Sequence, residues 1–514
     1  MLRASAMEIE LKLALDPAAV RAVGEHPLVR HYRERAPRSR EVENWYVDTP
    51  ALLLWRQQVE LRLRRIGGSH WQTLKRLPGA GRGARSAGGL HRLQECELPL
   101  RDRELDIAAM ASALPAAAAD LADLLRRAAA TGELSQRVHT RYRRTTWLLR
   151  SAKGDLVELA LDVGQVQACA KALPLCELEL ELKAGTEQAL FELAAGLQRD
   201  LPLRPEPRGK AERGFALLAP VAAAPRQAEA VPLSRSADRA AAMRLVVAEC
   251  LAHVQANETG VIETTDAEYV HQMRVGLRRL RSALGLFKDF ASPPPALLNE
   301  VKWAATTLGR VRDAEVLAHE SLVRVPAPPA ATGIAGDTLR AAAVAAAVRA
   351  RHEAVRLVRS PRHVAWQLAL MAWACGVAEP GDAAADELQA YAAAKLRRLR
   401  RKLLRCGGKL PGASPEVRHE VRIAAKKLRH AASLLGALDP GGAGRRRLRA
   451  LGALQEQLGL LNDAQVAVRG LARLAQADAS LASAAAYAEG WLLADTDRRV
   501  RGLGRLWHRV QRDL

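Results

Sequence analysis

Cysteine and aromatic residues are scarce in this chain. The six cysteines form no Cys-x-x-Cys pair and have no Cys/His ligand spacing, so neither a structural zinc site nor a disulfide framework is expected. Aromatic residues make up only 4% of the sequence. Because proteins usually hold single-stranded nucleic acid on stacked aromatic side chains, this scarcity argues against a nucleic-acid partner.

Long apolar runs are also missing. The longest, such as "AAAVAAAV" from Ala341, are rich in alanine and far shorter than the ~20 residues that cross a membrane. The N-terminal stretch "MLRASAMEIELK" has no apolar signal core. We therefore expect a soluble cytoplasmic protein without a membrane partner.

Positive charge is abundant. The 514 residues include 78 Lys+Arg against 56 Asp+Glu, a net charge of +22, and most of the excess lies in the second half. Such a balance favours a polyanionic partner. The length exceeds what one core can hold, so two or more domains are expected.

The first 220 residues alternate polar and apolar side chains in eight stretches. These stretches are 7–15, 42–47, 58–66, 70–77, 94–100, 141–150, 156–164 and 176–183. Alternation with a period of two predicts strands, and eight of them in this span predict one antiparallel barrel or sandwich. Residues 186–201 have the periodicity of a helix.

The stretch "ELELELK" at 177–183 raises a question of charge. Glu177, Glu179 and Glu181 must share one face of their strand, where like charges repel. Charged faces recur on other strands, with lysines and arginines among them, which indicates a charged interior. Carboxylates favour Mg²⁺ or Mn²⁺, and Arg and Lys favour phosphate oxygens. The alternative, a solvated outer face with cross-strand ion pairs, is common for a single strand.

The rest of the chain is predicted to be helical. Residues 221–235 are rich in proline and alanine and are expected to link a domain at 1–220 to an all-α domain at 236–514. The helical part repeats itself: "HQMRVGLRRLRSA" from His271 returns as "HEVRIAAKKLRHA" from His419, and "LGRVRDAEVL" from Leu308 returns as "LGLLNDAQVA" from Leu458. We infer a duplicated unit whose halves pack with pseudo-twofold symmetry.

Each copy of the repeat has a cationic stripe opposite an apolar face. The stripes are His271, Arg274, Arg278 and Arg281 in the first copy, and His419, Arg422, Lys426 and Arg429 in the second. Two such stripes facing each other would attract a flexible polyanion. A solvated surface is the alternative for a single stripe, and a metal or catalytic role for the histidines is a further one.

The ordered motifs of the first 220 residues resemble the CYTH family, the triphosphate tunnel metalloenzymes. "EIELK" at 8–12 matches the ExExK signature, and "ELRLRR" (60–65), "WQTLKR" (71–76), "VELALDVG" (157–164), "ELELELK" (177–183) and "GKAERGFALL" (209–218) follow in order. The resemblance implies an eight-stranded tunnel that holds a linear triphosphate and one or two Mg²⁺ or Mn²⁺ ions. It also implies attack by water, with no covalent enzyme nucleophile.

The resemblance assigns roles residue by residue. Glu8, Glu10 and Lys12 form the catalytic set, in which the carboxylates bind metal or orient water and the lysine contacts phosphate. The substrate-binding residues are Arg62, Arg64, Lys75, Arg144 (with Arg141 and Arg143 as alternatives) and Lys210. The metal carboxylates are Glu8, Glu10, Glu158, Asp162, Glu177 and Glu179.

The helical repeat resembles the CHAD domain, through "EYVHQMRVGLRRLRSALGLF" (268–287), "LGRVRDAEVL" (308–317) and "RHEVRIAAKKLRHAASLL" (418–435). CHAD domains are associated with inorganic polyphosphate, so the resemblance implies that the two stripes bind it. We expect hydrolysis of inorganic triphosphate to pyrophosphate and phosphate, polyphosphate binding, and residence at polyphosphate granules. The alternatives are a non-catalytic granule adaptor, or an enzyme acting on thiamine triphosphate or ATP.

Overall fold

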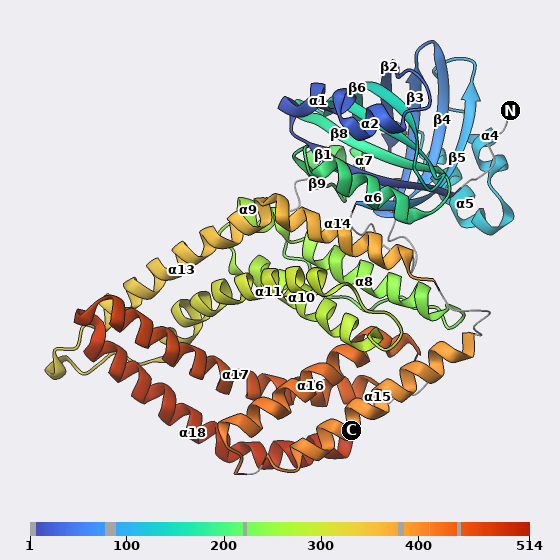
Figure 1. The fold of residues 1–514 in the computed structure, drawn as a ribbon. Helices are drawn as coiled ribbons and strands as arrows, with labels where there is room; N and C mark the ends of the chain where they lie inside the picture. Colours follow the sequence, from blue (N-terminus) through green and yellow to red (C-terminus); the bar gives the residue numbers. More distant parts are fainter. Residues whose placement is uncertain (1–6, 78–88, 219–223, 379–384, 411, 439–443) are drawn as a thin grey trace. The chain divides into compact units, whose positions relative to one another are not determined.

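The structure is a computed structural model that describes residues 7–77, 89–218, 224–378, 385–410, 412–438 and 444–514 (Figure 1). Its contacts divide the chain into two compact units. The first unit joins Met1–Ala224 with Pro361–Gly376, and the second joins Pro225–Ser360 with Val377–Leu514. Part of the expected linker, residues 219–223, lies outside the described residues.

Eight strands of the first unit close into an antiparallel barrel. They are β1 (Met7–Leu15), β2 (Arg38–Asp48), β3 (Val59–Ile66), β4 (Ser69–Arg76), β5 (Leu90–Leu100), β6 (Ser135–Arg150), β7 (Leu156–Ala168) and β8 (Lys171–Ala184). The order is β5-β4-β3-β2-β6-β7-β8-β1, and β1 pairs with β5 as well as with β8, which closes the ring. A short β9 (Leu203–Pro205) extends along β1. The predicted antiparallel tunnel is confirmed.

The apolar sides of the strands face outward and are covered by helices. Leu178 and Leu180 of β8 are fully buried in the region where α6 (Glu187–Gln198) crosses β8 and β1. Leu61 and Leu74 join a core with α4 (Ile107–Ala113) and α5 (Ala119–Ala130). Shorter helices complete the layer: α1 (Val20–Glu25), α2 (Pro27–Tyr32) and α3 (Leu53–Arg56). The charged sides therefore point into the barrel.

Helix α7 (Lys210–Leu218) fills the barrel interior near the turn between β7 and β8. Its Phe215 packs with Tyr46, Val138 and Tyr142 of the inner wall. The packing is close, because a Cβ added at Gly214 would lie 2.1 Å from Val138 Cγ1. One part of the interior is thus apolar and solid, and the remainder is charged.

Helix α14 (Pro361–Gly376) belongs to the first unit, although it lies in sequence within the helical region. It is apolar on nearly all sides and packs against α6. Gln198 Nε2 donates to the carbonyl of Pro361 at 3.0 Å. The division at residue 236 drawn from the sequence placed this helix in the all-α domain.

The second unit is helical throughout its regular structure. Its helices are α8 (Arg239–Gln255), α9 (Glu258–Glu263), α10 (Ala267–Phe287), α11 (Pro295–Val316), α12 (Leu322–Arg324), α13 (Gly336–Arg359), α15 (Ala385–Gly407), α16 (Pro415–Leu435), α17 (Gly444–Ala477) and α18 (Ala482–Asp513). Side chains of Asp266 and Ser414 cap the N-termini of α10 and α16. Within the described ranges, no helix is long and apolar enough to cross a membrane.

The duplication is visible in how the second unit packs. The first repeat segments form α10 and α11, the second form α16 and α17, and α10 contacts α16 while α11 contacts α17 (Figure 1). Ser282 Oγ lies 2.9 Å from His430 Nδ1, and these two residues occupy equivalent positions of the repeat. Equivalent residues meet each other only near a twofold axis, which supports the inferred pseudo-twofold arrangement.

Candidate functional site

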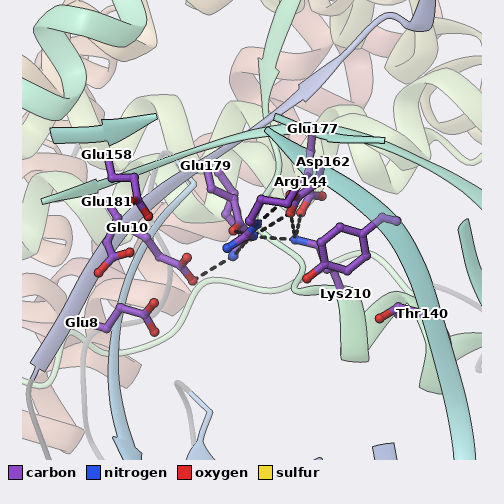
Figure 2. Close-up of polar contacts among 12 residues, drawn as sticks. Glu8, Glu10, Thr140, Arg144, Glu158, Asp162, Glu177, Glu179, Glu181 and Lys210 are labelled. Carbon is purple, nitrogen blue, oxygen red and sulfur yellow. Dashed lines mark hydrogen bonds and ion pairs between the residues drawn. The ribbon is translucent and has the colours of Figure 1, made fainter. Parts of the chain in front are cut away.

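Three carboxylates meet on the inner wall of the barrel, where β7 and β8 run side by side (Figure 2). Asp162, Glu177 and Glu179 are buried, and one oxygen from each lies within 4.8 Å of the others. The ammonium of Lys210, at the start of α7, lies among them at 2.7, 2.5 and 2.8 Å. Arg144 binds Asp162 through Nε and a terminal nitrogen at 2.7 and 2.6 Å, and also contacts Glu179.

The three carboxylates, which we call the triad, and the cations beside them stabilise each other's charges. Burial alone would raise the pKa of a carboxyl group, but Lys210 and Arg144 hold the pKa values of Asp162 and Glu179 below their ordinary values. Burial would likewise lower the pKa of Lys210, and the three carboxylates instead raise it. These directions keep Asp162, Glu179 and Lys210 ionised in a buried site.

The predicted catalytic set lies beside the triad on β1. Lys12 Nζ is 2.8 Å from Glu10 and also pairs with Glu179, so it connects the two groups of carboxylates. Glu8 pairs with Lys75 across the barrel at 2.8 Å. Burial raises the pKa of Glu10. The structure thus brings Glu8, Glu10 and Lys12 to one face of the interior, as the alternation predicted.

Strands β3 to β5 supply the cationic wall. Arg62 pairs with Glu95 at 3.0 Å and with Glu60 at 3.5 Å, and Lys75 pairs with Glu95 at 2.7 Å. Arg64 lies 3.7 Å from Glu97. The Nε groups of Arg62 and Arg64 are buried without a hydrogen-bond acceptor. These unused donors point to an anionic ligand with several acceptor oxygens.

Glu158, like Glu8 and Glu10, is a predicted metal carboxylate that lies outside the triad. It faces Glu181 across the β7–β8 pair, and Lys183 lies 3.9 Å from Glu158 and 2.5 Å from Glu181. Figure 2 shows both carboxylates on the same side of the site as Glu8 and Glu10, away from Lys210. Burial, together with Glu8 and Glu158, raises the pKa of Glu181.

A second cluster of charge lies in the helical unit, where α10 meets α16. Arg274, Arg278, Arg422 and Lys426 approach one another there, each half-buried. Burial and the neighbouring guanidinium groups lower the pKa of Lys426 to about 7 and that of Arg278 to about 10. Asp463 is the acidic group common to their surroundings. The cations here outnumber the acids, in contrast to the barrel.

The other members of the two stripes lie at the margin of this cluster. Arg281 and Arg429 are exposed, and Arg429 donates to Gln455 at 3.0 Å. His271 is half-buried near Arg312, whereas His419 is exposed. Along each stripe, the half-buried arginines and the lysine therefore lie at the centre, and the histidine lies toward one end.

Comparison with known proteins agrees with this division. The sequence model of the CYTH domain matches residues 6–215, and that of the CHAD domain matches residues 245–472. The crystal structure of the CHAD domain from the plant Ricinus communis is 36% identical, covers 56% of this chain and 96% of its own, and superposes with a TM-score of 0.52. The chain belongs to the CYTH–CHAD family.

The CYTH domain also has a curated relative, an inorganic triphosphatase from Haemophilus influenzae. The two are 28% identical over 214 residues, which is 41% of this chain. The match spans about half of that relative, 54% of its length. The likeness therefore extends over less than half of this chain.

The CYTH triad fits a hard divalent cation. Carboxylate oxygens are the ligands that Mg²⁺ and Mn²⁺ favour, and three of them converge here in a buried position. The ammonium of Lys210 compensates the negative charge of the three carboxylates, and a bound metal ion would compensate the same charge. Asp162, Glu177 and Glu179 are the residues that would hold it.

Some residues of these sites were not singled out from the sequence. Glu95 lies on a predicted strand, but its partners Arg62 and Lys75 come from other strands. Arg213 of α7 pairs with Glu177, and its Nε is buried without an acceptor. His430 was missed because its equivalent in the first copy is Ser282, so comparison of the copies does not mark it. The alternation of the strand at 94–100 was the one available signal for Glu95.

Proposed function

We propose that the CYTH domain hydrolyses inorganic triphosphate to pyrophosphate and phosphate with Mg²⁺ or Mn²⁺. The observation that carries this proposal is the buried acidic triad together with the tunnel arginines Arg62 and Arg64, whose Nε groups have no hydrogen-bond acceptor. Phosphoryl transfer depends on positioning and charge neutralisation, which such an interior supplies. The curated triphosphatase relative adds support.

The residues divide the work by their position. Arg62, Arg64 and Lys75 bind the phosphate chain from one wall, and Arg144, Lys12 and Lys210 bind it from the other. Glu8 and Glu10 orient the attacking water, whose oxygen bonds to the terminal phosphorus while the bridging P–O bond breaks and pyrophosphate leaves. A divalent cation held by Asp162, Glu177 and Glu179, with Glu158 nearby, would neutralise charge on the transferred group.

The test is phosphate release by the full-length protein with Mg²⁺ or Mn²⁺. Triphosphate, ATP, thiamine triphosphate and long polyphosphate are compared as substrates, for the wild type, Glu8→Ala/Glu10→Ala and a control, Glu41→Ala. Glu41 lies on the same barrel but is exposed and pairs with Arg143. We expect release from triphosphate that the double variant loses and the control keeps. No release from any substrate would support the granule adaptor instead, and faster release from another triphosphate would reassign the substrate.

We infer that the CHAD domain binds inorganic polyphosphate. The supporting observation is the half-buried cluster of Arg274, Arg278, Arg422 and Lys426, where burial and then repulsion by Arg422 and Arg278 lower the pKa of Lys426 to about 7. A phosphate chain would relieve this repulsion without requiring aromatic stacking. Residence at polyphosphate granules would follow from such binding.

Binding is tested by titrating the full-length protein with polyphosphate and then competing with single-stranded and duplex DNA. We expect polyphosphate to bind and DNA to displace it poorly. Displacement by DNA at equal phosphate concentration would favour a nucleic-acid partner.

A further inference from the structure

The two halves of the CHAD domain differ in charge in one short motif. The run "RDAE" at 312–315 of the first half corresponds to "NDAQ" at 462–465 of the second. The aspartates are the same, whereas the charged pair Arg312 and Glu315 becomes the neutral amides Asn462 and Gln465.

In the first half, Arg312 and Glu315 each lie beside oppositely charged side chains of the protein, although Oε2 of Glu315 is buried without a hydrogen-bond donor. Arg312 pairs with the exposed Glu320 and lies 3.9 Å from the buried Glu315. Glu315 is also 3.4 Å from Arg351. The guanidinium of Arg312 is therefore engaged by carboxylates, and little of its charge is left for a ligand.

In the second half, the equivalent place is a pocket that is half open to solvent. Its polar lining is Arg418, His419, Arg422, Asn462 and Gln465, and no carboxylate lines it among the described residues. Arg418 stands where the first half has Val270, so this half has also gained a cation.

The side chains of the pocket are suited to a tetrahedral anion. Arg418 donates to the carbonyl of Ala413 at 2.8 Å, which fixes its guanidinium at the wall. Arg422 is half-buried, its Nε has no acceptor, and it also belongs to the central cluster with Arg278 and Lys426. The pocket is thus continuous in charge with that cluster, and a chain bound there could reach it.

We propose that this second-half pocket is an anion subsite that holds one phosphate group of a bound polyphosphate chain, and that the first half has no equivalent subsite. This rests on the proposed polyphosphate binding. Arg418 and Arg422 provide charge-assisted hydrogen bonds, the Asn462 and Gln465 amides provide neutral donors, and the His419 ring provides an N–H donor. The two copies within one domain would then make different contacts with the bound chain.

The test transplants the first-half pair into the second half. Asn462→Arg/Gln465→Glu leaves the net charge unchanged, so long-range attraction is preserved while the pocket is filled and its arginine is paired. The matched control is the reverse change, Arg312→Asn/Glu315→Gln, in the first half. Affinity of the full-length proteins for polyphosphate of defined length is measured by titration calorimetry at one salt concentration.

We expect the second-half variant to bind at least tenfold more weakly and the first-half variant to bind no more weakly than the wild type. Equal loss in both, or no loss in the second-half variant, would overturn the asymmetry. If that variant does not fold, the single change Arg418→Gln decides, with binding within twofold of the wild type counting against the subsite. A wild type that binds no polyphosphate would instead overturn the proposed function of the domain.

Discussion

The CYTH tunnel and the central CHAD cluster both gather buried cations, but they balance them differently. In the tunnel each lysine and arginine of the site has a carboxylate partner, as Lys210 has three. In the CHAD cluster Arg278 and Lys426 mainly face other cations, and their pKa values fall. A site whose charges are balanced keeps its geometry without a ligand, which suits catalysis. A site with excess positive charge is stabilised most when a polyanion binds and relieves the repulsion, which suits binding.

Removing a cation from the balanced site should have the largest effect. Lys210→Met leaves the triad without its shared ammonium, and breaking such a buried pair costs about 3–5 kcal/mol of stability. Hydrogen exchange of the β7 and β8 amides measures this for the CYTH domain alone. Lys153→Met is the control, because its pair with Glu192 is exposed and contributes little once water screens it. Similar losses in both variants would contradict a balanced, buried site.

Salt should separate the two sites next. If about four cations of the CHAD cluster neutralise phosphates, polyphosphate affinity should fall roughly 50-fold between 50 and 200 mM salt, by analogy with single-stranded nucleic acid. The KM of the tunnel for triphosphate should change much less, since buried charges are screened less. Titration and initial rates at the same salt concentrations measure both. An equal dependence of polyphosphate affinity and of the triphosphate KM on salt would contradict the difference between the two sites.

A third difference concerns packing, because α7 occupies one part of the barrel interior and packs tightly there. Gly214→Ala forces a methyl group against Val138 and should lower the free energy of unfolding by about 1–3 kcal/mol. Thermal unfolding measures the effect. Gly68→Ala is the control, since nothing lies within 4 Å of a Cβ at that turn. An unchanged melting temperature for Gly214→Ala would mean that α7 does not sit tightly in the barrel.

The smallest effect concerns pH and sharpens the description of the CHAD cluster. With a pKa of about 7, lowered by burial and then by Arg422 and Arg278, the Lys426 amine is mostly neutral at pH 8. A bound phosphate favours the protonated form, so binding takes up a proton and polyphosphate affinity falls as pH rises above 7. The fall is at most about tenfold per unit, or ~1.4 kcal/mol.

The measurement is affinity between pH 7.5 and 9, where ordinary histidines are already neutral. Lys426→Arg should bind with little pH dependence in this window, because arginine stays charged. A pH dependence that persists in Lys426→Arg would assign the titration to another group.

The strand faces could be predicted from the sequence, and the partners across the barrel could not. Period-two alternation fixes which side chains of one strand lie together, so Glu177 and Glu179 were placed correctly on a charged inner face. It does not say which strands become neighbours. The contacts of Glu95 with Arg62 and Lys75 therefore required the closed sheet.

The helical segments show a related limit. Residues 361–376 lay in the part of the chain predicted to be helical, whereas residues 209–218 were singled out only as a motif. Nothing local distinguishes a helix that enters a barrel or packs on α6 from one in an all-α bundle. Phe215 and Trp366 would be buried in either setting. The repeat predicted the pairing of α10 with α16, because equivalent segments of a duplicated unit tend to meet across an axis.

The hydrogen bond between Ser282 and His430 says something about the history of the domain. In a homodimer built from one copy of the repeat, a residue at the twofold axis faces its own counterpart and must be compatible with itself. Fusion of two copies into one polypeptide removes that requirement, so the axial pair is free to become a serine and a histidine. The same freedom lets one copy keep an internal ion pair at Arg312 while the other opens a pocket at Asn462, a division of labour that identical subunits of a dimer cannot evolve.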